Sequence, residues 1–257
     1  VEVARFPEPS LDEELPEVHT LFMDGTRAYI ANTGRGSLQI FELADPTAPV
    51  FLGEYFHPGV ATEGGFVHDL YVEDGRAYLA YWNLGLAIVD CQDPTAPVLV
   101  GTFDGYPRRK SHSVWVTSAG GRRVAVHGDE DFGAHVRVVD VDDQGVAFLD
   151  VLSEFQTREA VSVHNIMTVG ELAFVTYYQD GLRVLDLADP THPVEIAHYD
   201  TWDATTPSPD LFGRSFYEGA IGVDYDAATG LLHVVDTHRG LFLLRLDRRA
   251  RRARFLR

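Results

Sequence analysis

Four histidines occupy the same position in an internal repeat of this chain. They are His19 in VHTLFM, His68 in VHDLYV, His112 in SHSVWV and His164 in VHNIMT. Neutral imidazole is a good ligand for transition metals, and a site made of three or four imidazoles leaves a coordination position open for water or substrate. If the fold brings the four rings together, the sequence predicts a transition-metal site, with Fe, Cu, Zn or Mn as the candidate ions.

The spacing of the histidines indicates which fold would bring them together. Consecutive histidines are 49, 44 and 52 residues apart, and a fifth unit, GAIGVDY, has Ile221 at the same position. Repeats of this length that consist of strands are typical of β-propeller blades. After each histidine come runs rich in Val, Ile, Leu and Tyr, such as RAYLAYW and LAIVD, which have the length and composition of short strands. No segment shows a convincing helical pattern.

A proline-containing turn precedes the last strand of three units. Residues 45–49, 93–97 and 189–193 begin with Asp-Pro-Thr and end with proline, which favours a tight turn. Each unit is therefore predicted to hold four antiparallel strands. The chain is predicted to be an all-β, five-bladed β-propeller that forms a single domain over residues 1–257. The blades are expected at residues 19–55, 68–103, 112–155, 164–199 and 221–246.

The fifth unit has only three predicted strands, and the missing one is expected at the other end of the chain. VEVARF at residues 1–6 resembles VEIAHY at residues 194–199, which is the predicted last strand of the fourth unit. The N-terminal segment is therefore predicted to complete the last blade, which would remove an exposed sheet edge. Residues 247–257 are predicted to be an Arg-rich, solvated tail outside the blades.

Residues 86–90, Leu-Ala-Ile-Val-Asp, resemble the LVIVD repeat of a family of β-propellers that includes the choice-of-anchor B proteins. The resemblance covers almost the whole chain and is most characteristic over residues 164–202 and 217–245. It implies the propeller fold and says little about activity. The chain departs from the family pattern at Glu42 and Arg245, which replace the repeat aspartate, and at Ile221, where relatives often have tryptophan.

The composition limits the partners that the protein can bind. A formal net charge of -18 argues against nucleic acids, because their phosphate backbone would be repelled. The expected partner is a small-molecule substrate or a glycan, bound by a monomer. Cys91 is the single cysteine, so no intramolecular disulfide can form, and no apolar run is long enough to predict a membrane span. The family resemblance implies an extracytoplasmic protein, either secreted or periplasmic.

Further candidate site residues are expected at the same end of the blades as the histidines. In an antiparallel blade, the start of the first strand lies beside the turn between the second and third strands. Asp129 and Glu130 occupy such a turn and could act as ligand, general base or acceptor for an imidazole N–H. Tyr178, in the equivalent turn of the fourth unit, is the third candidate catalytic side chain. The candidate substrate-pocket residues are Trp82, Asn83, Trp202, Phe216 and His238.

Other interpretations of the histidines stay open at this point. A histidine at a strand start can bond a neighbouring backbone group, and duplication would copy that structural device into every blade. The same end of the fold could hold a protein or glycan without catalysis. It could also cleave a glycoside between two carboxylates taken from Asp69, Asp129, Glu130 and Asp131. The remaining histidines are expected to be ordinary, with His127 and His238 as the best substitute ligands: His57, His127, His135, His192, His198, His233 and His238.

Overall fold

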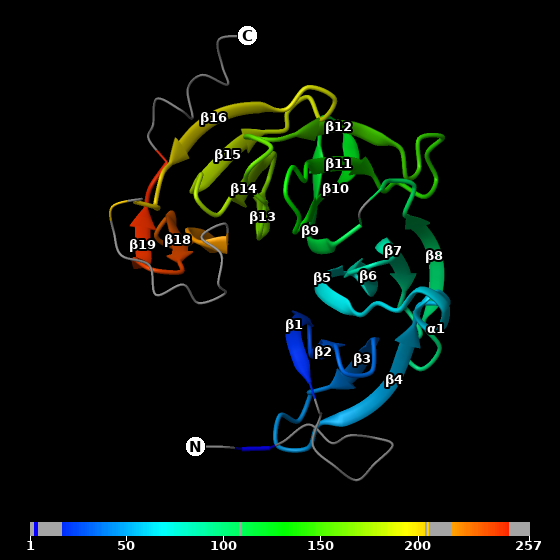
Figure 1. The fold of residues 1–257 in the computed structure, drawn as a ribbon. Coiled ribbons are helices and arrows are strands. Elements are labelled where there is room, and N and C mark those ends of the chain that lie inside the picture. Colours follow the sequence, from blue (N-terminus) through cyan, green and yellow to red (C-terminus); the bar gives the residue numbers. More distant parts are fainter. Residues whose placement is uncertain (1–2, 5–16, 108, 204, 206–216, 247–257) are drawn as a thin grey trace. The chain divides into compact units, whose positions relative to one another are not determined.

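The protein is almost entirely β-structure (Figure 1). Its computed structural model describes residues 3–4, 17–107, 109–203, 205 and 217–246. Within these ranges it has 19 strands in five antiparallel sheets and one helix of four residues. We call the sheets blades one to five, in chain order. The predicted all-β class and its division into five repeated sheets are therefore confirmed.

The chain divides into two compact units, Val1–Val114 and Trp115–Arg257. Blades one and two belong to the first unit, and each is a sheet whose strands are hydrogen-bonded in sequence order. Blade one consists of β1 (Val18–Asp24), β2 (Arg27–Asn32), β3 (Ser37–Glu42) and β4 (Val50–Phe56). The short helix α1 (Val60–Glu63) leads to blade two, which consists of β5 (Val67–Glu73), β6 (Arg76–Tyr81), β7 (Gly85–Asp90) and β8 (Val98–Phe103).

The second unit holds most of blade three and all of blades four and five. Blade three consists of β9 (Ser111–Ala119), β10 (Arg122–Asp129), β11 (Val136–Asp140) and β12 (Val151–Phe155). Blade four consists of β13 (Ile166–Val169), β14 (Leu172–Thr176), β15 (Leu182–Asp186) and β16 (Val194–Tyr199). Blade five consists of β17 (Ala220–Asp226), β18 (Leu231–Asp236) and β19 (Gly240–Leu244). The border between the units falls inside β9, a continuous strand that is hydrogen-bonded to β10.

The core of each unit lies between neighbouring blades. Strands two and three of blades one to four are largely buried on both faces, because both faces pack against other side chains. In the first unit one buried cluster joins blades one and two, and it includes Tyr29, Leu38, Ile40, Leu79 and Tyr81. In the second unit a similar cluster joins blades three and four, and it includes Val126, Val138, Val175, Tyr177 and Leu185. The packing of blade on blade therefore provides the hydrophobic core that a single sheet could not.

The Asp-Pro-Thr turns are structural, as the sequence indicates. In each of the three, the threonine backbone N–H and hydroxyl both donate to the aspartate side chain, as Thr47 does to Asp45 at 2.9 and 2.6 Å. The turn of one blade also packs against the last strand of the preceding blade. Ser153 on β12 donates its hydroxyl to the carbonyl of Pro190 at 2.6 Å. In the first unit, Gly53 on β4 lies against the carbonyl of Pro94.

Replacing Gly53 by alanine is expected to destabilise the fold by about 2 kcal/mol or more, because a methyl group there would overlap the carbonyl oxygen of Pro94. Urea unfolding monitored by tryptophan fluorescence measures this loss. Gly105→Ala is the matched control, since a methyl group at Gly105 meets no atom within 4 Å. Equal stability of the two variants would show that the Pro94 turn does not pack tightly on β4.

Two predictions about the ends of the chain lie outside the described ranges. The closing strand at residues 1–6 falls there except for Val3 and Ala4, and the Arg-rich tail at 247–257 falls there completely. The single-domain organisation likewise stays a prediction. In the part of the chain that the structure describes, no helix is long and apolar enough to cross a membrane.

Candidate functional site

The backbone sets the histidine position by a repeated β-bulge. The strand pairing skips His19 in β1 and His68 in β5, so each histidine is the extra residue opposite the neighbouring strand. The pairing skips Ile221 in β17 in the same way. A bulge redirects the side chain of the extra residue and often occurs beside functional sites. In blades one, two, four and five the start of the first strand pairs with the end of the second, as Val67 does with Tyr81. His19, His68 and His164 therefore lie beside the turn between the second and third strands of their blades.

Three of the histidines form a row of adjacent rings, which we call the histidine row (His19, His68 and His112). The ring centroids of His19 and His68 are 3.9 Å apart, and those of His68 and His112 are 4.0 Å apart. His19 is exposed, His68 is half-buried and His112 is buried. The rings therefore lead from the surface toward the interior.

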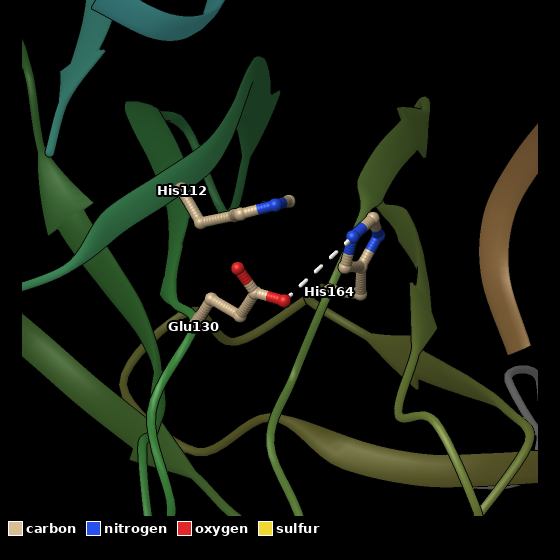
Figure 2. Close-up of side chains that lie close together, drawn as sticks. All are labelled: His112, Glu130 and His164. Carbon is tan, nitrogen blue, oxygen red and sulfur yellow. Dashed lines mark ion pairs between the residues drawn. The ribbon is translucent and has the colours of Figure 1, made fainter. Parts of the chain in front are cut away.

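His112 also belongs to a second arrangement, which we call the His112–Glu130–His164 group (Figure 2). His112 lies near the start of β9, Glu130 directly follows β10 in the same blade, and His164 lies two residues before β13. One nitrogen of each histidine and one carboxylate oxygen of Glu130 all lie within 4.8 Å of one another. The Nε2 of His164 is 4.0 Å from Glu130 Oε1. Among the described residues, these are the three His, Cys, Asp or Glu side chains whose possible ligand atoms lie close enough together to hold a metal ion.

Backbone hydrogen bonds determine which ring nitrogen of these histidines is basic. The Nδ1 of His164 lies 2.5 Å from the carbonyl oxygen of Ile221, and the Nδ1 of His68 lies 3.1 Å from that of His112. A carbonyl oxygen only accepts, so Nδ1 carries the hydrogen and the neutral ring has its lone pair on Nε2. In His164 this is the nitrogen nearest Glu130. Histidines that bind metals have their tautomer fixed in this way.

Tyr178 holds the carboxylate of Glu130. Its hydroxyl donates a hydrogen bond to Glu130 Oε1, and its ring packs edge-on against His164 with centroids 5.1 Å apart. Burial and the neighbouring carboxylate raise the pKa of the Tyr178 hydroxyl far above its usual range, so the hydroxyl keeps its hydrogen and remains a donor. Its backbone has a positive φ of 37° and is paired to Ala220 in both directions. Tyr178 therefore positions Glu130.

The carboxylate of Asp129 pairs with an arginine, whereas the sequence suggested that it could act as a metal ligand, a general base or an acceptor for an imidazole N–H. Arg137 on β11 binds its carboxylate through Nη1 at 2.5 Å and also reaches Glu154 through Nε at 3.0 Å. The side chains of Arg137 and Asp129 are 10% and 3% exposed, which makes this a buried ion pair. We therefore assign no chemical step to Asp129. Sequence reasoning missed Arg137, although it lies in VRVVD, the strand that follows the acidic turn.

The predicted substrate-pocket residues lie in separate places. Trp82 stacks on Phe66 with centroids 5.7 Å apart and lies 5.2 Å from His68, so it borders the histidine row, and Asn83 follows it in the turn. Trp202 donates from Nε1 to Glu218 at 3.3 Å, before blade five. His238, in the last turn of blade five, contacts the hydroxyl of Thr237 at 2.7 Å. Phe216 lies outside the described residues. The five residues stay predictions.

The structure thus brings together part of the predicted metal site. His112 and His164 converge with Glu130, whereas His19 and His68 are not members of that three-residue group. Glu130 and Tyr178 are candidates that the sequence placed in the correct turns. The carbonyl of Ile221, which fixes His164, could not be foreseen, because any residue type offers a carbonyl at that position.

His127, the proposed substitute ligand, is fully buried in β10 opposite Arg137. Burial outweighs the opposing negative charge of Asp129 and, with a smaller contribution from the positive charge of Arg137, lowers the pKa of His127 to about 4. His127 is therefore neutral in the folded protein at neutral pH, while in the unfolded chain it titrates near pH 6.5. The unfolded state binds more protons between these values, so stability is lost as the pH falls through this window.

We expect the titration of His127 to remove about 2 to 3 kcal/mol of stability between pH 7.5 and pH 4.5, because its pKa is lowered to about 4 in the folded protein. The measurement compares the free energy of unfolding of the unaltered chain and of His127→Gln at both pH values. The variant should lack this part of the pH dependence. An identical pH dependence in both proteins would show that His127 does not titrate as proposed.

Comparison with known proteins identifies the repeat and the fold. A family model of the LVIVD repeat matches residues 64–105 and 162–201. No curated protein matches the chain. The computationally designed Ika8 protein is 12% identical with a TM-score of 0.57, over 89% of this chain and 60% of Ika8. BamB from Moraxella catarrhalis is 11% identical with a TM-score of 0.57, over 88% of this chain and 56% of BamB.

A third solved structure is the β-propeller domain of Cps50 (Swd1) from Myceliophteria thermophila. It is 13% identical with a TM-score of 0.60, over 90% of this chain and 70% of that one. At these identities the likeness shows the fold alone. The chain is therefore a β-propeller that carries LVIVD repeats, with five blades in its described residues, as its resemblance to the LVIVD-repeat family predicts.

Proposed function

We propose that this propeller is a transition-metal-dependent enzyme that acts on a small molecule and whose centre is the His112–Glu130–His164 group. The observation that carries the proposal is the convergence of two imidazole nitrogens and one carboxylate oxygen within 4.8 Å. Two imidazoles and one carboxylate are the ligands of catalytic zinc in several hydrolases and of iron in non-haem oxygenases. Such a set leaves positions for water or substrate.

The spacing of the group suits an ion after a small adjustment. Ligand atoms about 2.0 to 2.1 Å from a tetrahedral ion lie about 3.3 Å from one another. The 4.0 Å between His164 Nε2 and Glu130 Oε1 would therefore shorten by less than an ångström, and a spacing at the 4.8 Å limit of the group would shorten by about 1.5 Å. These two side chains are 21% and 18% exposed, so solvent reaches both of them. One carboxylate and two neutral rings also give the group a net negative charge, which favours a cation.

The roles of the individual side chains follow from their contacts. His112, Glu130 and His164 would hold the ion, and the Ile221 carbonyl keeps the basic nitrogen of His164 directed toward it. The Tyr178 hydroxyl holds Glu130 in place. A bound ion supplies Lewis-acid chemistry, which acidifies a water molecule or polarises a substrate oxygen. A hydrolytic, lyase or oxygen-activating reaction fits this chemistry, with a small molecule or a glycan as the substrate.

A purely structural role for the histidines explains only part of these contacts. His68 and His164 both donate from Nδ1 to the carbonyl at the equivalent position of the next blade, as a duplicated structural device would. His164 also lies beside Glu130 and its partner Tyr178, and a structural hydrogen bond from His164 requires neither of them. His68 is therefore a natural reference for separating the two roles.

Equilibrium dialysis of protein purified without an affinity tag tests the proposal. We expect one Zn²⁺ or Co²⁺ per chain, removed by a chelator, and an affinity at least 100-fold lower in Glu130→Gln, which loses a charged ligand. The exposed Glu159→Gln is the matched control and should bind as the unaltered chain does. Binding that is absent, or that is the same in Glu130→Gln, would refute the proposed centre.

Tyr178→Phe is expected to lower the metal affinity by about 10- to 100-fold, because side chains that orient a metal ligand typically contribute this much. The ring is retained, so the packing against His164 and the stability of the fold should change little. Competition with a chromophoric chelator measures the affinity, with Tyr225→Phe as a control for the loss of a hydroxyl elsewhere. An unchanged affinity would mean that Tyr178 does not position Glu130.

Turnover separates an enzyme from a module that binds a metal without catalysis. For an enzyme, activity toward a panel of small esters, phosphates and glycosides should disappear with a chelator and return with the ion. It should also disappear in Glu130→Gln. Loss of activity in Asp69→Asn with full activity in Glu130→Gln would instead favour glycoside cleavage by carboxylates.

A further inference from the structure

The proposed centre uses two of the four repeated histidines, and the histidine row contains the other two. We propose that the row of His19, His68 and His112 is the path by which a transition-metal ion enters and leaves the centre. This inference rests on the proposed function, because His112 is both the inner end of the row and a ligand of the His112–Glu130–His164 group.

The burial of the three rings gives the path its direction. His19 is exposed on β1, His68 is half-buried on β5, and His112 is buried on β9 with 2% of its surface exposed. An ion that approached the buried His112 alone would exchange most of its hydration for a single nitrogen ligand. With His19 at the surface, the first imidazole would replace water where water is still present. The row therefore divides a large desolvation step into smaller ones.

The spacing of the rings allows one ion to be shared between neighbours. The ring centroids are 3.9 Å apart for His19 and His68 and 4.0 Å apart for His68 and His112. Two imidazoles bound to one ion have centroids about 4.5 to 5 Å apart, given metal–nitrogen bonds of about 2.0 to 2.1 Å. A splay of about an ångström therefore suffices for each pair. The ion can pass from ring to ring while it keeps at least one nitrogen ligand.

The hydrogen bond of His68 indicates a metal ion, not a proton, as the species that moves. A proton relay through an imidazole takes up a proton at one ring nitrogen and releases it at the other. The Nδ1 of His68 donates to the backbone carbonyl of His112 at 3.1 Å. A relay would stop there, because a backbone carbonyl accepts a hydrogen bond but does not pass a proton on. The same bond leaves the lone pair on Nε2, the form that binds a metal. Trp82, 5.2 Å from His68, adds an apolar border to the row.

A path makes a kinetic prediction that a ligand does not. It lowers the barrier in both directions, so its removal must slow loading and release by the same factor and leave the equilibrium affinity unchanged. Removal of a ligand weakens the affinity. The ratio of the two rate constants therefore separates the two roles.

The test is stopped-flow loading of the full chain with Co²⁺, followed by its absorbance, and release into excess chelator. The variants are His19→Ala, at an exposed position, and His68→Asn, whose side-chain amide can replace the Nδ1 donor to the His112 carbonyl. His192→Ala, which removes a histidine with 83% of its side chain exposed on a distant turn, is the matched control. Circular dichroism melts establish that each variant is folded.

We expect the double variant to load and to release Co²⁺ at least tenfold more slowly than the unaltered chain, with a Kd changed by less than twofold. Unchanged rates would overturn the path while the centre itself remains supported. A weakened Kd would overturn it as well, because His19 or His68 would then be a ligand. If the unaltered chain binds no Co²⁺, the proposed function fails and the path fails with it.

Discussion

From the proposed centre, replacing His112 and His164 together by alanine is expected to lower the affinity of the chain for Co²⁺ or Zn²⁺ by at least about 1000-fold. The reason is that protein zinc sites, which typically bind with about 10 to 16 kcal/mol, share this free energy among only a few ligands, so that the loss of two should remove several kcal/mol. Isothermal titration against a competing chelator measures the change. The reference protein is the double variant His19→Ala, His68→Asn, which removes two histidines of the same repeat and should keep its affinity.

Replacing the buried His112 removes packing as well as a proposed ligand, so a variant of His164 alone is also compared with the unaltered chain. His112 is almost fully buried, whereas His164 is 21% exposed at its side chain. His164→Ala alone should therefore fold as the unaltered chain does and still lose at least about tenfold in affinity. Full affinity in a folded His164→Ala variant would exclude His164 as a ligand and would favour the structural role of the repeated histidines.

Arg137→Met will destabilise the protein by about 3 to 5 kcal/mol at neutral pH, because it leaves the carboxylate of Asp129 buried without its guanidinium partner. Glu154, the second partner, is 46% exposed at its side chain and stays in contact with water. The loss should therefore come almost completely from Asp129. Urea unfolding at pH 7 measures it.

The double variant Arg137→Met, Asp129→Leu is the decisive comparison for this ion pair. It removes both charges and fills the space with apolar groups, so it should recover most of the lost stability. A double variant as unstable as Arg137→Met alone would show that packing, and not the unpaired charge, is responsible. Both variants keep Glu130 and the histidines, so a folded double variant should still bind metal.

Much of the fold could be predicted from the sequence because its signals are local and repeated. The phase of His19, His68, His112 and His164, together with runs such as LAIVD, marks the strands of each blade. The Asp-Pro-Thr turns carry their own hydrogen bonds, so each can be recognised without its neighbours. The antiparallel order of strands then places Glu130 and Tyr178 at the same end of the blades as the histidines.

The composition of the site could be predicted only in part, because it depends on backbone geometry. The bulges at His19 and His68 direct their side chains, and a bulge has no signature in these sequences. Which rings converge depends on the loops between blades, whose lengths differ. The sequence therefore predicted four equivalent ligands, whereas the structure separates a row of three rings from a group that contains Glu130. The roles of Asp129 and Arg137 depend on a cross-strand contact for the same reason.

Anomalous diffraction from crystals grown with Co²⁺ or Zn²⁺, recorded on both sides of the absorption edge of the metal, tests the central claim most directly. We expect one strong peak about 2.0 to 2.2 Å from a ring nitrogen of His112, from Nε2 of His164 and from an oxygen of Glu130. A peak at other residues, or none at these three in crystals that contain the ion, would contradict the proposed centre.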